Sequence, residues 1–172
     1  GREMTEGEKA QAGYLYGANY EKDIIKMRET CADLCYEFNM CRPSDIVKQK
    51  ELIRKIIGNI KGNIVITAPF YCDYGINISV GDNFYTNHNE TILDGAKVTF
   101  GDNVFIAPNC VFSTAGHPFD VEQRNMGLEI ALPITVGDNV WIGTGVSVLP
   151  GVSIGRNTII GAGSVVNRDI PD

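Results

Sequence analysis

Hydrophobic positions recur every six residues through the second half of the chain. From residue 136 onward an aliphatic residue stands at every sixth position, namely at Val136, Ile142, Val148, Ile154, Ile160 and Val166. The same step occurs upstream, where Phe100, Ile106 and Phe112 follow one another. Amphipathic helices have a period of about 3.6, so positions six apart drift around a helix, and an ordinary sandwich does not give a step of six without drift either.

A period of six is typical of a β-helix built from hexapeptide repeats. Short strands alternate inward and outward residues, a corner turns the chain, and three hexapeptides close one triangular coil. The inward aliphatic residues then stack on those of the next coil, about 4.8 Å away. Glycine follows four of the six aliphatic positions, as Gly137, Gly143, Gly155 and Gly161. We expect these glycines at corners, where a side chain would be strained or crowded.

The chain divides into two parts of different period. Residues 4–60 are predicted to form an N-terminal helical segment, and residues 61–172 the β-helix. Residues 1–3 precede a methionine and are expected to derive from an expression vector. The six-residue pattern is missing at about 114–132, where polar and turn-forming residues dominate, so this segment is predicted to be a loop extruded from the scaffold.

Three helices are expected in the N-terminal segment. Thr5 followed by Glu8 has the spacing of a capping box, which predicts a first helix that ends near Gly17. Apolar residues at a helical period predict a second helix over about 20–38. A third helix is predicted to begin at Asp45, directly after a Pro-Ser pair.

Size and charge exclude several classes of function. The chain has 172 residues, enough for one domain with a sizeable core. The net charge of −6 argues against a general binder of nucleic acid or anionic membrane. No apolar stretch approaches the roughly 20 residues of a membrane span, and no signal-peptide pattern is present. We therefore expect a cytoplasmic protein with no nucleic-acid or membrane partner.

The five cysteines are expected to be free thiols. Cys31, Cys35, Cys41, Cys72 and Cys110 make an odd number, which does not suit a disulfide framework. Cys31 and Cys35 are four residues apart and would share a helix face. A metal site there would need two more soft ligands, and Cys41 is the only nearby candidate. The sequence therefore predicts no metal site.

The predicted loop contains one of the two histidines, His117. A loop histidine is often only a solvated turn residue. Here Gly116 permits a close approach of the backbone and Pro118 stiffens it. A neutral imidazole can accept a hydroxyl proton at neutral pH, so His117 is a candidate general base. The other histidine, His88, is expected at the surface or an interface, and two histidines are too few for the three-histidine zinc site of a carbonic anhydrase.

Several motifs resemble those of the maltose and galactoside O-acetyltransferases over residues 4–172. They are Ala12-Gly13-Tyr14-Leu15-Tyr16, Tyr36-Glu37-Phe38-Asn39, Cys72-Asp73-Tyr74-Gly75, Asn83-Phe84-Tyr85-Thr86-Asn87, Gly116-His117-Pro118, Asn139-Val140-Trp141-Ile142-Gly143 and Ile160-Gly161-Ala162-Gly163-Ser164-Val165-Val166. The resemblance implies a mainly β fold, a left-handed parallel β-helix behind an α-helical segment. It also implies a homotrimer with active sites between subunits, and acetyl-CoA as co-substrate without a metal.

The resemblance implies a direct transfer of acetyl to a hydroxyl. His117 would remove the hydroxyl proton, and the backbone N–H of Thr144 would stabilise the tetrahedral oxyanion. Asn87 and Asp73 match acceptor-binding positions. Glu129 would either bind the acceptor or orient His117, and a plain surface carboxylate is an equal alternative.

The resemblance also implies a coenzyme-binding stretch. The residues that match it are Trp141, Thr144, Ala162, Asn167 and Arg168. Small residues would leave a channel for the pantetheine arm, and Arg168 would meet a phosphate of the coenzyme. Trp141 is equally well explained as a packing residue. Family members usually continue past the position of Asp172 with a segment that contacts the nucleotide, so a truncated chain is expected.

The acceptor is less well defined. Galactoside-type enzymes carry an acidic residue where this chain has Gly95. They carry another in the first helical region, at a position where this chain has Ala18 or Asn19. Maltose or glucose and a galactoside are both candidate acceptors. The alternatives are a hydroxylated antibiotic or serine as acceptor, or a non-catalytic β-helix scaffold.

Overall fold

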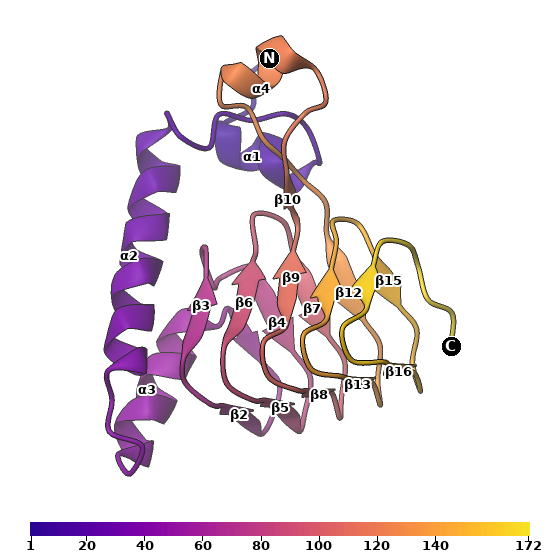
Figure 1. The fold of residues 1–172 in the computed structure, drawn as a ribbon. Helices are drawn as coiled ribbons and strands as arrows, with labels where there is room; N and C mark the ends of the chain where they lie inside the picture. The colour runs from indigo at the N-terminus through magenta and orange to yellow at the C-terminus, as the bar shows by residue number, and fades with distance from the viewer.

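The computed structural model describes residues 1–172 as a triangular prism of about five stacked coils, with helices at its N-terminal end (Figure 1). Each face of the prism is a five-stranded parallel sheet. The first sheet contains β1 (Asn59–Ile60), β4 (Ile78–Val80), β7 (Val98–Phe100), β12 (Ile134–Val136) and β15 (Ser153–Ile154). The second contains β2 (Ile64–Ile66), β5 (Phe84–Thr86), β8 (Phe105–Ile106), β13 (Trp141–Ile142) and β16 (Ile159–Ile160). The third contains β3 (Phe70–Cys72), β6 (Glu90–Leu93), β9 (Val111–Ser113), β14 (Ser147–Val148) and β17 (Val165–Val166).

The six-residue register predicted from the sequence is the register of the core. Phe100 in β7 pairs with Val80 below and Val136 above, and Val136 pairs with Ile154. All four side chains point inward and are at most 4% exposed. Burial of each such side chain contributes roughly 1.5–3 kcal/mol. The expected fold class, a mainly β parallel β-helix of hexapeptide repeats behind an N-terminal helical segment, is confirmed.

Three edges separate the faces of the prism. We call the turn after the first sheet the Asn83 edge, the turn after the second sheet the Asn87 edge, and the turn after the third sheet the His117 edge. At the Asn83 edge glycines allow successive coils to approach closely: a Cβ on Gly101 would lie 2.8 Å from the Asp138 backbone nitrogen, and a Cβ on Gly137 2.7 Å from that of Arg156. The crowding expected at corner glycines is present at Gly137, Gly143 and Gly155 but not at Gly161, where a Cβ would only be in ordinary contact with Ser164.

Asparagines, rather than these glycines, take the left-handed backbone conformation at the Asn83 edge. Asn83, Asn103, Asn139 and Asn157 all have φ between 54° and 60°. Their side chains form a ladder along the prism, because each amide nitrogen donates to the next amide oxygen at 2.8, 3.2 and 3.0 Å. The ladder ties consecutive coils together outside the backbone sheet.

The N-terminal helices agree with the expectations at most ends. Helix α1 (Glu6–Gln11) has the predicted capping box between Thr5 and Glu8. Helix α2 spans Lys22–Asn39, and helix α3 (Ile46–Ile56) begins after the Asp45 cap. The expected end of the first helix near Gly17 was wrong. The helix ends at Gln11 because Gly13 turns with φ 78°, and the chain then extends to pair with the distant loop.

Helices α2 and α3 pack at the first coil of the prism, and α2 lies beside β3 (Figure 1). Phe38 of α2 and Ile56 of α3 join the same buried cluster as the β-helix interior. The Asn39 side chain pairs with the Phe70 backbone, accepting at 2.8 Å and donating at 3.0 Å. Helix α2 therefore covers β3, which is the edge strand of the third sheet. None of the helices has the length and apolar character needed to cross a membrane.

One charged side chain, Glu90, points into the core of the β-helix. It is 1% exposed, its Oε2 accepts from the Cys110 backbone N–H at 3.1 Å, and its Oε1 has no partner. Burial raises the pKa of Glu90 to about 8. The folded protein thus holds the carboxyl proton of Glu90 more tightly than the unfolded chain does. The resulting stability is fully present below about pH 4.5 and is lost as the pH rises through about 8.

We expect Glu90→Gln to flatten the pH dependence of stability. In the unmodified protein, Glu90 should lower the free energy of unfolding by up to about 1.4 kcal/mol per pH unit between those limits. Urea unfolding at several pH values measures both proteins, and Glu122→Gln on an exposed helix is the matched control. Equal slopes for the unmodified protein and Glu90→Gln would contradict this assignment.

Candidate active site

The predicted loop leaves the prism at the His117 edge, directly after β9. Its root is Thr114, which is fully buried: its hydroxyl donates to the Leu93 carbonyl at 2.6 Å and accepts from the Ala96 N–H at 3.1 Å. The chain runs out as β10 (Ala115–Gly116) and returns antiparallel as β11 (Ile130–Ala131), as Figure 1 shows. A short helix, α4 (Val121–Asn125), forms the tip.

This hairpin positions His117. Ala115 pairs with Ala131 and Gly116 with Ile130, so one further step of the register sets His117 opposite Glu129. Glu129 is held in turn by the N-terminal segment, because its backbone and that of Tyr16 exchange two hydrogen bonds of 3.0 Å. The His117 side chain is exposed, and it forms no hydrogen bond with Glu129.

Beside the hairpin lies a group of polar side chains that we call the Tyr16 cluster: Tyr16, Arg28, Asp73, Tyr74 and Glu129. The Tyr16 hydroxyl lies 3.4 Å from Glu129 Oε2, and Arg28 Nη1 donates to the Tyr74 hydroxyl at 3.2 Å. Burial raises the pKa of Asp73; the nearby Glu129 raises it further, and Arg28 opposes the change. The structure therefore brings two predicted residues, Asp73 and Glu129, into one electrostatic neighbourhood.

The two phenols of the Tyr16 cluster are kept protonated. Burial raises the pKa of Tyr16 and of Tyr74, and nearby carboxylates add to both shifts. The turn that carries Asp73 is held from below by Asp94, whose Oδ1 accepts from the backbone N–H groups of Asp73 and Tyr74 at 3.1 and 2.9 Å. Asp94 is itself fully buried, and burial raises its pKa to about 6.

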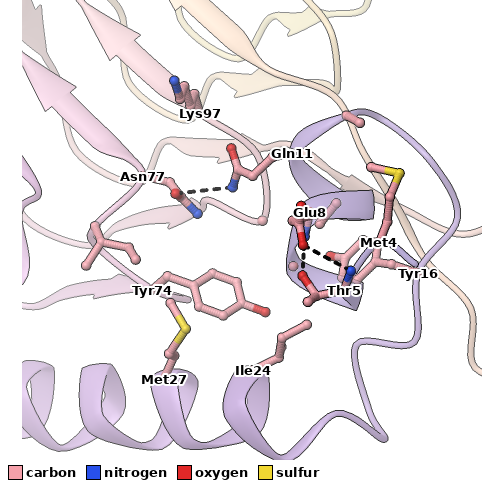
Figure 2. Close-up of a pocket in the computed structure, with 15 residues that line it drawn as sticks. Met4, Thr5, Glu8, Gln11, Tyr16, Ile24, Met27, Tyr74, Asn77 and Lys97 are labelled. Carbon is pink, nitrogen blue, oxygen red and sulfur yellow. Dashed lines mark hydrogen bonds between the residues drawn. The ribbon is translucent and has the colours of Figure 1, made fainter. Parts of the chain in front are cut away.

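An open cavity of about 810 Å³ lies between α1, α2 and the prism (Figure 2). Tyr16 and Tyr74 form part of its wall, together with Met27 and a hydrogen-bonded pair, Gln11 and Asn77, whose side chains are 3.3 Å apart. His117 does not line it. The cavity therefore adjoins the Tyr16 cluster but does not include the candidate base.

Three other predicted residues lie at a different edge of the prism. Asn87, Thr144 and Ala162 each follow a strand of the second sheet and belong to the Asn87 edge. Asn87 is half-buried, and its Oδ1 accepts from the backbone N–H of His88 at 2.7 Å. His88 is exposed, as expected, and its Nδ1 is within hydrogen-bonding distance of the Ala68 carbonyl.

Thr144 presents a free backbone donor. Its hydroxyl donates to the Pro108 carbonyl at 2.8 Å, and the next residue, Gly145, donates its N–H to the same oxygen at 2.9 Å. The Thr144 N–H has no partner within the chain, and the residue is exposed. A Cβ added to Gly145 or Gly163 would meet nothing within 4 Å, so the surface beside this donor is open.

The remaining predicted residues are exposed. Asn167 and Arg168 follow β17 and lie at the His117 edge. Trp141 points outward from β13 and is 55% exposed, so it is not a packing residue within this chain. One chain therefore presents the predicted residues at two separate edges. It brings Asp73 and Glu129 together, and places His117 on the same hairpin as Glu129, whereas Asn87 and Thr144 lie at another edge.

Sequence reasoning assigned no role to Tyr16, Arg28 or Tyr74. Both tyrosines belong to the motifs that carry the family resemblance. Arg28 had its own signal, because it is four residues after Ile24 and three before Cys31, on the face of α2 that turns out to be buried. A charge on an apolar helix face needs a partner, and here the partner is Tyr74.

Comparison with known proteins identifies the family. Residues 133–168 match the family described as "Bacterial transferase hexapeptide (six repeats)", and residues 9–62 match the "Maltose acetyltransferase hexapeptide capping motif". The galactoside O-acetyltransferase of Escherichia coli K12 is 45% identical over 168 residues, which cover 98% of this chain and 82% of the relative.

Solved structures give the same result. A maltose O-acetyltransferase from Clostridium difficile 630 superposes with a TM-score of 0.95 at 44% identity, covering 99% of this chain and 90% of that one. A galactoside acetyltransferase in complex with coenzyme A gives a TM-score of 0.93 at 42% identity, covering 98% and 84%. This chain therefore belongs to the maltose and galactoside O-acetyltransferase family of hexapeptide-repeat acyltransferases.

Proposed function

We propose that this acyltransferase moves the acetyl group of acetyl-CoA to a hydroxyl of a sugar, with His117 as general base. The observation that carries the proposal is the hairpin at the His117 edge. It holds an exposed imidazole on a short, hydrogen-bonded support, opposite Glu129 and beside the Tyr16 cluster. A general base needs this combination of access to substrate and fixed position.

The Tyr16 cluster suits a sugar as acceptor. Two protonated phenols and an arginine can donate hydrogen bonds, and two carboxylates can accept them, which matches the mixed donors and acceptors of neighbouring sugar hydroxyls. The carboxylates of Asp73 and Glu129 would also repel an anionic acceptor. Glu129 turns its side chain toward Tyr16, which favours a role in acceptor binding over the orientation of His117.

The proposed transfer is direct. His117 takes the proton from the sugar hydroxyl as its oxygen attacks the thioester carbonyl carbon, and the carbonyl electron pair moves onto oxygen. The N–H of Thr144 stabilises that oxyanion. The carbon–sulfur bond then breaks, and the coenzyme thiolate leaves with the proton that His117 carries. Asn87 holds the acceptor or the reacting oxygen through its amide.

These roles require two copies of the chain. His117 and Thr144 lie at different edges of the prism, so one chain holds only half of the constellation. The outer face of the second sheet also carries a continuous exposed apolar row, formed by Val65, Tyr85, Phe105, Trp141 and Ile159. We propose a homotrimer in which the Asn87 edge of one copy meets the His117 edge of the next.

Coenzyme A would lie along this junction. The open surface beside Thr144, with Ala162 exposed on the next coil, leaves room for the pantetheine arm. Trp141 would contact the arm, while Asn167 and Arg168 would bind polar groups and a phosphate. The absence of a metal from the reaction and the cytoplasmic location stay predictions.

His117→Ala is expected to lower kcat/KM for acetyl transfer by about 10²–10⁴, because the hydroxyl loses its base. The KM for acetyl-CoA should change little, since His117 acts on the acceptor. Thiol release from acetyl-CoA measures both constants. His88→Ala is the matched control and should retain activity, whereas a loss of less than about tenfold in His117→Ala would refute the general base.

A panel of acceptors tests the substrate class. Maltose, glucose and a β-galactoside should accept acetyl faster than a hydroxylated antibiotic or serine, because the Tyr16 cluster offers bonds to several hydroxyls. Asp73→Asn should raise the KM for the preferred sugar more than that for acetyl-CoA. Equal and negligible rates with all sugars would rule out the sugar acceptor while leaving the general-base test intact.

A further inference from the structure

Three cysteine thiols that acetyl transfer does not use converge where α2 packs on the first coil. Cys31 and Cys35 lie on one face of α2, and Cys72 ends β3. The Cys31 and Cys72 sulfurs are 3.4 Å apart, the Cys35 and Cys72 sulfurs 3.9 Å apart, and all three lie within 4.8 Å of one another. The sequence suggested Cys41 as the only nearby companion, but Cys41 instead donates to the Glu37 carbonyl at 3.3 Å.

These separations are close to those that a common metal ion needs, although the 3.4 Å pair would have to move apart by roughly half an ångström. With metal–sulfur bonds of about 2.3 Å, the ligand sulfurs of one ion lie about 4 Å from each other. The two backbones that carry the thiols are also fixed, because Asn39 at the end of α2 forms two hydrogen bonds with Phe70 at the start of β3. Three soft ligands are therefore in place before any ion arrives.

We propose that Cys31, Cys35 and Cys72 bind a single Cu(I) ion in trigonal coordination. Thiolates select soft cations, among them Cu(I) and Zn(II). Structural zinc sites almost always have four protein ligands, and no histidine or carboxylate joins the three sulfurs to complete such a set. A three-sulfur site without a fourth protein ligand is suited to Cu(I).

The surroundings allow an ion to reach the site and then shield it. Cys31 and Cys35 are buried in the main apolar cluster, which keeps water from most of the site. A surface depression lined by Cys35, Cys72, Met40 and Tyr71 connects the sulfurs with solvent. The site thus has one open side and an otherwise apolar wall.

Binding of the ion is coupled to the loss of protons from the thiols. Binding replaces three S–H bonds by three Cu–S bonds and releases three protons, with no change in oxidation state. Affinity should therefore fall as the pH is lowered.

The test is an anaerobic titration of the full-length, reduced protein with Cu(I) in the presence of bicinchoninate as competing chelator. We expect one Cu(I) per chain, a thiolate-to-copper absorption band in the ultraviolet, and protection of the half-buried Cys72 thiol from alkylation. Cys72→Ser should weaken binding more than about a hundredfold, because loss of even an outer partner of a ligand costs 10- to 100-fold. Cys41→Ser is the matched control and should bind as the unmodified protein does.

Cys31→Ala provides a second disruption, with circular dichroism to verify folding, since alanine is well tolerated in a helix. The proposal is overturned if the chelator removes all copper, or if both cluster variants retain copper like Cys41→Ser. Stoichiometric binding of Zn(II) but not Cu(I) would also overturn it. None of these outcomes depends on acetyl transfer.

Discussion

The stacking of one coil on the next, backbone to backbone, is the constraint on which the rest of this structure depends. The N–H of Gly101 donates to Val136 and that of Gly137 to Ile154, both at 2.8 Å. Each coil must therefore repeat the length and corners of its neighbour. Because inward positions then coincide along the prism, aliphatic residues at a six-residue step build a continuous core, and a shift by one residue would turn that core outward.

The proposed chemistry is confined to the places where this constraint is relaxed. The extruded loop can depart from the repeat because buried Thr114 secures its root and a hairpin supports it. The N-terminal segment reaches over to the same hairpin through Tyr16 and adds the polar groups that the β-helix lacks. At the Asn87 edge the turns stay regular, but they leave the Thr144 N–H without a partner. A rigid scaffold thus presents the two halves of the proposed site.

Much of the fold was predictable because the repeat is local information. The inward row through Val136, the loop at about 114–132 and the capping box at Thr5 all depend on residues close in sequence. The Asn83 ladder had a signal that was overlooked, the recurrence of Gly-Asp-Asn at residues 81–83, 101–103 and 137–139. The end of the first helix was misjudged because pairing with Glu129, far along the chain, extends the segment after Gly13.

The candidate site was predictable only in part, for the same reason. His117 stood out because it lies in the segment that breaks the register. Its position opposite Glu129 depends on hairpin pairing, and the pairing of Arg28 with Tyr74 joins a helix to the first coil. The approach of Cys72 to Cys31 spans 41 residues and arises only when α2 packs on β3. No local pattern carries such contacts.

The division of the proposed active site between two copies is the central claim, and mixed oligomers test it most directly. His117→Ala and Asn87→Ala chains, each inactive alone, would be co-expressed with different tags and the mixed species purified. In a mixed trimer one of the three junctions would pair an intact His117 edge with an intact Asn87 edge, so about one third of the activity should return. Activity no greater than that of the separate variants would contradict a shared site.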